Sequence, residues 1–319
     1  MRTVMAPGSP TDVDVAVVGG SLAGLQTALT LGRACRRVAV FDDGRPRNAP
    51  AAHVHNFLGV AATRPEDLLA AARRLLDDYD VTVVGSRVRA VRREGDRFRV
   101  TADGGTAMAR SVVLATGLRD ELPEVPGVHE LWGRDVVACP HCHGWEVRGL
   151  PLAQLGRPGM AARAVERAVL LSRWSPDVVL FTDGDEVPAA LRTRLDTAGV
   201  RACTDPVRRL VLAEGRLRAV ELRDGRTIAR SAVFVVTRQH QQSDLAQQLG
   251  CEHVTDGPAA GAVSTDSTGA TSVPGIWAAG TVAVPALLAI GAAGHASTVA
   301  LAVHNHLLER DLAAPRVRR

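Results

Sequence analysis

Two cysteines separated by two residues, Cys139 and Cys142, are the sequence's most chemically suggestive pair. The run Cys139–Glu146 reads CPHCHGWE. Two cysteines at this spacing can cycle between a dithiol and a disulfide, and a nearby cation or helix N-terminus makes the reactive thiolate available near neutral pH. His143 follows the second cysteine and is predicted to move protons during thiol exchange. The run therefore predicts thiol–disulfide chemistry by Cys139, Cys142 and His143, with Trp145 expected to pack.

Three other uses of this run compete with redox chemistry. Cys139, Cys142 and His143 match the C-x-x-C-H pattern of covalent haem attachment, which belongs mostly to exported haem proteins. With His141 they also offer zinc ligands, but a structural zinc site usually takes a second Cys or His pair from elsewhere, and none has a suitable spacing. A purely structural disulfide is disfavoured in a reducing compartment. We therefore favour redox chemistry and expect no metal.

A glycine-rich turn near the N-terminus predicts a nucleotide-binding unit. Val13–Val18 is an apolar β-branched run; after the turn, Leu25–Arg33 reads as a helix and Arg37–Phe41 as a second strand. In this order the turn's N–H groups meet a pyrophosphate at the helix N-terminus, and an acid about 20 residues further on binds a ribose. Ser21 replaces the middle glycine, which makes close approach by the backbone less favourable. The candidate cofactor-binding residues are Gly19, Gly20, Ser21, Ala23, Gly24 and Asp42.

A second glycine turn, Gly156–Gly159, lies between the apolar run Leu152–Leu155 and an expected helix. Pro158 occupies the position of the middle glycine, where its ring adds bulk and no N–H is available to a phosphate. The next strand runs into the acidic stretch 182–186, which would repel the 2′-phosphate of NADPH. We expect this second site to be defective for a nicotinamide cofactor.

Two such units predict an α/β fold of two nucleotide-binding, Rossmann-like three-layer domains, the second inserted in the first. Boundaries are expected in the polar stretches near residues 118 and 238. Residues 1–117 and 239–319 then form a discontinuous outer domain, and residues 118–238 a central domain that carries the two cysteines. Further expected elements are a helix over Glu66–Tyr79, strands within 81–113, Val178–Phe181 and 207–236, and a long C-terminal helix to about Leu308.

Composition limits the possible partners and location. All 38 basic residues are arginine, the formal net charge is +4, and no basic run is interleaved with aromatic residues, which disfavours a nucleic-acid surface. Residues 1–11 lack the apolar core of a signal peptide and are expected to form a disordered tail. Residues 273–294 are uncharged, but their glycines and prolines predict a buried strand, turn and helix rather than a membrane span. Cys35, Cys203 and Cys251 are expected as buried thiols, and the protein is expected in the cytoplasm.

These features together resemble the low-molecular-weight thioredoxin reductases over nearly the whole chain. The N-terminal glycine turn, the motif at 115–117, the central C-x-x-C and the block Val273–Gly280 occur in the order and at the spacing of that family. The resemblance implies FAD bound by the outer domain. The residues it assigns to FAD are Ala115, Thr116, Gly117, Gly280 and Thr281, with Arg47 and Asn48 beside the adenosine and Asn56 near the isoalloxazine ring.

The residues after the second cysteine narrow this resemblance. Thioredoxin reductases ordinarily have an aspartate there, whereas His-Gly-aromatic-Glu is similar to the FAD-dependent dithiol oxidases that close disulfides in gliotoxin-type and holomycin-type natural products. By that resemblance Cys142 faces the flavin and Cys139 meets the substrate. It implies a homodimer that oxidises a small-molecule dithiol, with O2 as the final electron acceptor and H2O2 as product.

Two departures and two alternatives accompany this hypothesis. Thr281 stands where relatives have an acidic residue that holds the ribityl chain, and together with Ser21 it predicts weaker retention of FAD. The first alternative is an NADPH-dependent thioredoxin or disulfide reductase, which Pro158 disfavours. The second is a catalytically degenerate flavoprotein fold that serves as a binding module, which the complete Cys139–Glu146 run disfavours.

Overall fold

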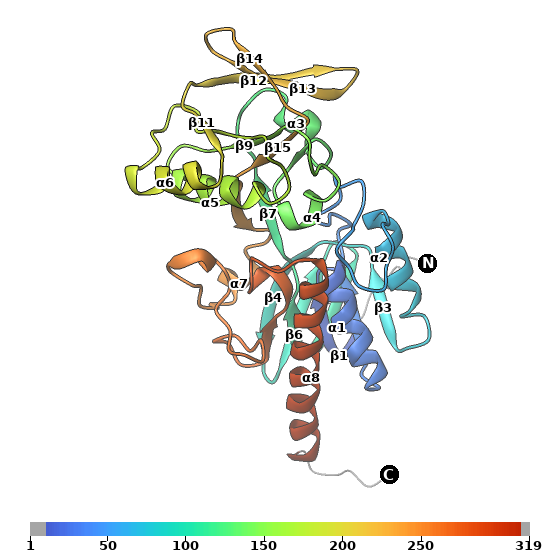
Figure 1. Cartoon of the computed structure of the whole chain (residues 1–319). Helices are drawn as coiled ribbons and strands as arrows, with labels where there is room; N and C mark the ends of the chain where they lie inside the picture. Colours follow the sequence, from blue (N-terminus) through green and yellow to red (C-terminus); the bar gives the residue numbers. More distant parts are fainter. Residues whose placement is uncertain (1–10, 314–319) are drawn as a thin grey trace.

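The computed structural model describes residues 11–313, which form two large β-sheets, one above the other in Figure 1. The outer sheet has seven strands in the order β3-β2-β1-β6-β5-β4, with β17 paired to β6. The tail expected over 1–11 lies outside the described residues, except for Thr11, which opens β1. The strands are β1 (Thr11–Val18), β2 (Val38–Phe41), β3 (Val81–Val84), β4 (Val88–Glu94), β5 (Arg97–Ala102), β6 (Gly105–Leu114) and β17 (Ile276–Ala278).

Helices cover one face of the outer sheet, and antiparallel strands curl over the other. Val15 and Val17 of β1 are buried against the helices. Ala16 and Val18 of the same strand are buried on the opposite side, with β4 and β5. Successive side chains of a strand point to opposite faces, so a valine-rich run buried on both faces becomes a central parallel strand. The helices on the first face are α1 (Leu22–Arg33), α2 (Pro65–Arg74) and α8 (Ala289–Ala313), and α7 (Leu245–Gln248) lies on the second.

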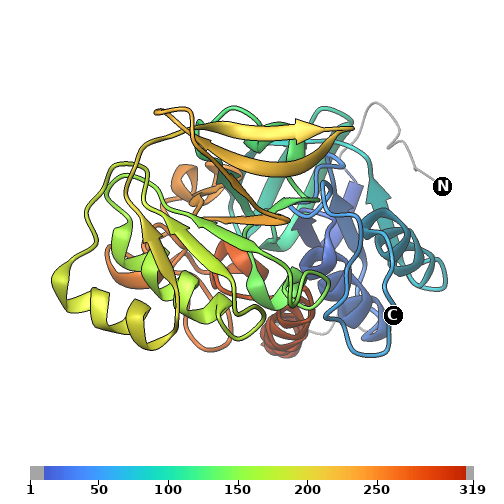
Figure 2. The ribbon, with the colours of Figure 1, turned by 45° about the horizontal axis from the view of Figure 1, so that its top comes forward.

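The central sheet has five parallel strands in the order β11-β10-β9-β15-β8. Helices pack on one face, and a three-stranded antiparallel sheet with α3 covers the other, as Figure 2 shows. This gives the unit three layers. Its elements are α3 (Val128–Leu131), β8 (Val136–Val137), α4 (Pro140–His143), β9 (Leu152–Leu155), α5 (Ala161–Leu171), β10 (Val178–Phe181), α6 (Ala189–Thr197), β11 (Arg201–Cys203), β12 (Val207–Ala213), β13 (Arg216–Leu222), β14 (Thr227–Ala229) and β15 (Ala232–Val235).

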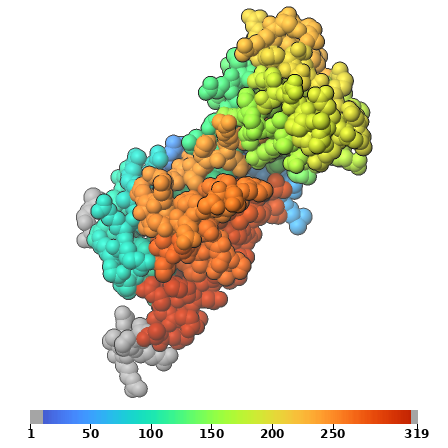
Figure 3. Space-filling model, turned by 90° about the vertical axis from the view of Figure 1, so that its left-hand side faces the viewer, coloured from blue at the N-terminus to red at the C-terminus, as the bar shows by residue number. Residues whose placement is uncertain are grey.

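A pair of strands joins the two units. β7 (Leu118–Glu121) and β16 (Arg238–Gln241) pair antiparallel, in the polar stretches where the sequence predicts the boundaries. Every strand of the central sheet lies between them in the chain, whereas β17 and α8 return to the outer sheet. The second layered unit is therefore inserted in the first. In Figure 3 the segment after β16 covers one side of the outer unit, and the central unit projects beyond it.

Two expected helix ends were wrong. The helix expected over Glu66–Tyr79 ends at Arg74 and is followed by turns. Two aspartates just beyond that point would face the negative end of the helix dipole, which disfavours a longer helix. The C-terminal helix continues past Leu308 to Ala313. Its last turn is anchored by Asp311, whose carboxylate oxygens lie 2.6 Å from guanidinium nitrogens of Arg36 and Arg110.

Two of the three cysteines expected as buried thiols, Cys35 and Cys203, differ from that expectation. Cys251 is buried and Cys203 half-buried, but Cys35 is exposed. The reason is local, because Cys35 lies in the turn after α1 with a φ of 58°, where the chain reverses at the surface.

The uncharged stretch 273–294 folds as predicted. It contains β17, the 3-10 turn η2 (Gly280–Val282) and the start of α8; another such turn, η1 (Gly257–Ala259), precedes it. Within residues 11–313 no helix combines the length and apolar character needed to cross a bilayer.

Candidate functional site

Cys139 and Cys142 form a disulfide at the start of the short helix α4, with their Cα atoms 5.3 Å apart. Cys139 is the N-cap residue, and its carbonyl accepts hydrogen bonds from the N–H groups of Cys142 and His143, both at 3.2 Å. Pro140 fits the first helical position because no N–H is needed there. These hydrogen bonds fix the backbone around the disulfide. Both cysteines are partly exposed, so a partner can still reach the disulfide.

His143 lies beside the disulfide with both ring nitrogens buried and without a hydrogen-bond partner among the described residues. Burial lowers the pKa of His143, while the nearby Glu146 charge acts in the opposite direction. Glu146 also pairs with His55 of the loop from the outer unit, the two side chains lying 3.5 Å apart. The structure therefore brings a loop of the outer unit into contact with the segment that follows the disulfide. An imidazole in this state is neutral near pH 7 and can accept a proton.

Trp145, which the sequence predicts to pack rather than take part in the chemistry, is 65% exposed. The guanidinium of Arg148 stacks over its ring, with Cζ 3.9 Å from the centroid. The aromatic that supports this turn is Trp174, which contacts the His141 ring edge-on at 5.5 Å between centroids. A Cβ on Gly144 would overlap the Trp174 ring, so Gly144 allows this close contact.

The first glycine turn is as tightly packed as a nucleotide-binding turn requires. A Cβ on Gly19 would overlap the carbonyl of Ala115, one on Gly20 would overlap the Asp42 side chain, and one on Gly24 would overlap the Gly19 carbonyl. Helix α1 thus begins directly against the turn. Ser21 is its N-cap, and the hydroxyl makes no capping hydrogen bond. These contacts leave the N-terminal N–H groups of a twelve-residue helix facing the carboxyl edge of the outer sheet.

The other predicted cofactor residues meet at the same edge. Gly117, at a φ of 67°, lies against Thr281, whose Oγ1 would be 3.4 Å from a Cβ placed there. Gly280 lies against Ala23 and donates its N–H to Nδ1 of His295 at 3.0 Å. A cavity of about 60 Å³ opens between the strand ends. Among its lining residues are Gly19 and Thr116.

Two charged residues among those predicted at this edge, Asp42 and Arg47, are paired within the protein. Asp42 accepts a hydrogen bond from Arg73 at 2.5 Å. Arg47 forms a two-bond ion pair with Asp120 of the connector β7, at 2.6 and 2.7 Å. Asn48 is half-buried in the same loop as Arg47, and Asn56 is exposed in the loop that carries His55. Sequence reasoning missed Arg73, since nothing near it in the chain marks it as a partner of Asp42.

The second glycine turn is closed by the protein's own side chains. The N–H of Gly159 donates to the carboxylate of Asp185 at 3.0 Å. Arg157 turns away toward β7, where it donates to the carbonyl of Glu121 at 2.9 Å and pairs with the Glu121 carboxylate. A carboxylate thus occupies the turn N–H that would otherwise face a phosphate. The sequence shows the acidic stretch, but only the structure shows that Asp185 folds back onto the turn.

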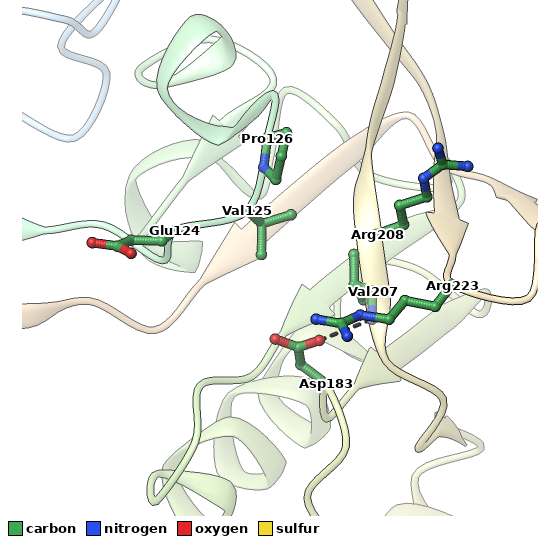
Figure 4. Close-up of a pocket in the computed structure, with 7 residues that line it drawn as sticks. All are labelled: Glu124, Val125, Pro126, Asp183, Val207, Arg208 and Arg223. Carbon is green, nitrogen blue, oxygen red and sulfur yellow. Dashed lines mark hydrogen bonds between the residues drawn. The ribbon is translucent and has the colours of Figure 1, made fainter.

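A polar hollow of about 470 Å³ lies elsewhere in the central unit, between β12 and the loop after β10 (Figure 4). Asp183 in its wall accepts a hydrogen bond from the Val207 N–H at 2.8 Å. The hollow includes neither cysteine and no residue of either glycine turn, so it is separate from the redox site. Its lining residues are Glu124, Val125, Pro126, Asp183, Val207, Arg208 and Arg223. In the described range no group of three or more His, Cys, Asp or Glu residues could hold a metal ion.

Comparison with known proteins places this geometry in a family. Residues 13–305 match the pyridine nucleotide-disulphide oxidoreductase model. Thioredoxin reductase sirT of Leptosphaeria maculans is 32% identical over 325 residues, which cover 96% of this chain and 97% of that protein. The crystal structure of HlmI is 44% identical, with a TM-score of 0.90 and 96% of each chain covered. An oxidoreductase from Agrobacterium tumefaciens is 34% identical, with a TM-score of 0.86 over 94% of this chain and 99% of that one. The chain therefore belongs to the pyridine nucleotide-disulphide oxidoreductases, a family of flavoproteins, and is a thioredoxin-reductase-like oxidoreductase that acts on sulfur groups.

Proposed function

We propose that this protein oxidises a small-molecule dithiol to an intramolecular disulfide, in the biosynthesis of a natural product, with FAD as cofactor and O2 as the final electron acceptor. The observation that carries this direction is the hydrogen bond from Gly159 to Asp185 in the second glycine turn. Because the Gly159 N–H is bonded to a carboxylate, it cannot donate to the pyrophosphate of a nicotinamide cofactor. The ring of Pro158 fills the space beside it. Electrons then enter through the disulfide and leave through the flavin.

The residues at the carboxyl edge of the outer sheet fit FAD. The glycines of the first turn are packed so closely that no side chain fits there, and the N-terminus of α1 offers N–H donors to a pyrophosphate. Asp42 is the residue proposed to bind the ribose, and a hydrogen bond from Arg73 orients its carboxylate. When bound, FAD accepts two electrons from the cysteine pair and passes them to O2, which gives H2O2.

The cysteine pair performs two thiol exchanges. A substrate thiolate attacks Sγ of Cys139, which breaks the Cys139–Cys142 bond and releases the Cys142 thiolate. The second substrate thiolate then attacks the sulfur bound to Cys139, closes the substrate disulfide and releases the Cys139 thiolate. The substrate loses two electrons and two protons, the cysteine pair gains the electrons, and His143 is placed to take a proton.

Oxygen uptake with a simple dithiol tests this function. With dithiothreitol in air, the purified protein is expected to consume one O2 and form one H2O2 per disulfide made, and to leave added NADPH unoxidised. Cys139→Ser is the control for the pair and should stop uptake. Flavin reduction by NADPH, or turnover that needs NADP⁺ and consumes no oxygen, would instead establish a disulfide reductase, as several relatives are named. A colourless protein that FAD does not restore would establish a binding module.

A pH profile tests His143 as the proton acceptor. Only the neutral imidazole accepts a proton, so kcat/KM rises with pH through the pKa of His143. Burial lowers that pKa, so the rise should fall on the acid side of the ordinary value of about 6.5. His143→Asn should lower kcat/KM about 10²-fold and remove this acid limb. The exposed neighbour His141 provides the control, since His141→Asn should keep the limb; an unchanged profile in His143→Asn would exclude the role.

We further propose the domain division at residues 118 and 238, because β7 and β16 pair at those points. A homodimer is proposed because Leu301, Leu308 and Leu312 form an exposed apolar stripe along α8, with the spacing of one helix face. The cytoplasm is the proposed location, since Cys35 is an exposed free thiol, as a reducing compartment allows.

A further inference from the structure

A half-buried cation, Arg167, contacts the segment just before the redox pair and takes no part in the chemistry above. It belongs to α5, the helix packed beside α4 in Figure 1. Its guanidinium donates to the carbonyl of Ala138, the residue before Cys139, and to the carbonyl of Val235 at 3.4 Å. Arg167 therefore holds the backbone that leads directly into the disulfide.

The charge of Arg167 is not neutralised by a carboxylate of its own. Its hydrogen bonds both go to main-chain carbonyls, and it forms no ion pair within residues 11–313. The acid that acts on it, Asp120, is occupied by Arg47 at 2.6 Å and by the Thr237 hydroxyl at 2.8 Å. Burial lowers the pKa of Arg167 to about 10, so the guanidinium remains charged at neutral pH.

The other titratable groups near the pair are neutral or face partners of their own. His143 is neutral near pH 7 because burial lowers its pKa. Glu146 and His55 lie 3.5 Å apart and face each other, and His141 is exposed and turned onto Trp174. Arg167, by contrast, donates to the residue next to Cys139 and keeps its charge at neutral pH.

We propose that Arg167 is a positioning residue whose half-buried charge stabilises the Cys139 thiolate. The consequence for the reaction rests on the proposed function, in which Cys139 leaves as a thiolate when the substrate disulfide closes. A thiolate stabilised in this way is a better leaving group, and the stabilised reduced state makes the Cys139–Cys142 disulfide a stronger oxidant. An oxidase of dithiols needs both properties.

Charge and hydrogen bonding can be separated with two variants. Arg167→Gln keeps a donor for the Ala138 carbonyl but removes the charge, whereas Arg167→Lys keeps the charge. Arg163→Gln is the matched control, because Arg163 is exposed one turn earlier on the same helix. Each is made in the Cys142→Ser background for thiol titration and in the intact pair for redox equilibration. Circular dichroism checks folding, and Arg167→Met replaces the glutamine variant if that protein does not fold.

The rate of Cys139 alkylation by iodoacetamide as a function of pH gives the thiolate fraction. Arg167→Gln is expected to lower that fraction about tenfold at a fixed pH below the thiol pKa. In glutathione buffers it should shift the equilibrium of the intact pair about tenfold toward the disulfide, which corresponds to about 30 mV. Arg167→Lys should restore both values, and Arg163→Gln should leave them unchanged.

Equal alkylation profiles and equilibria in Arg167→Gln and Arg163→Gln would overturn the proposal. So would an equal change in the Gln and Lys variants, which would mean that Arg167 acts through packing alone. Neither measurement uses a substrate, oxygen or the flavin. Failure here therefore leaves the proposed oxidase function standing, and failure of oxygen uptake leaves this result standing.

Discussion

Cys142→Ser should lower flavin bleaching by an added dithiol about 10³-fold or more, since the two cysteines act as one unit. In the wild type, anaerobic dithiothreitol should bleach the flavin within the mixing experiment. In the variant, the substrate thiolate finds no disulfide to attack, because Cys139 has lost the partner to which it is bonded. The electrons then have no route from the dithiol to the cofactor.

The control for this experiment is another cysteine of the same protein. Cys251→Ser removes a buried thiol that contacts Thr271 in the outer unit and is not disulfide-bonded. It should bleach at the wild-type rate, after correction for any loss of stability. Rapid bleaching of Cys142→Ser would show that the dithiol reduces the flavin directly, and would remove the disulfide from the electron path.

Much of the fold follows from short-range patterns. Val178–Phe181 and Leu152–Leu155 are strands with the predicted ends, because continuous apolar runs between turns form buried parallel strands. The glycine turns were also predictable from local sequence, because glycine itself marks the positions where no Cβ fits. Gly19, Gly20 and Gly24 show this directly.

The remainder depends on contacts between residues far apart in the chain. Arg167 is one of 38 arginines, and what sets it apart is its hydrogen bond to the Ala138 carbonyl, which no local pattern reports. Asp185 appears in the sequence as one acid among several, and its hydrogen bond to Gly159 depends on a turn 26 residues away. The length of α8 likewise depends on Arg36 and Arg110, which pair with its last turn.

The second large effect is expected at Gly24 and concerns stability as well as the cofactor. A Cβ at this position would overlap the carbonyl oxygen of Gly19, which is backbone and cannot turn aside as a side chain can. Gly24→Ala must therefore push α1 away from the glycine turn. These are the two elements that we propose present N–H groups to the pyrophosphate of FAD. We expect the free energy of unfolding to fall by about 3 kcal/mol and the purified protein to lose most of its flavin.

Another helical glycine separates this clash from the ordinary effect of alanine. Gly294 lies in α8, and a Cβ there would meet no atom within 4 Å. Gly294→Ala should therefore keep its flavin and be up to about 1 kcal/mol more stable, since alanine favours a helix over glycine. Urea denaturation with the flavin-to-protein absorbance ratio measures both quantities. If the two variants had equal stability and equal flavin content, the contact between Gly24 and Gly19 would not be what holds α1 at the cofactor site.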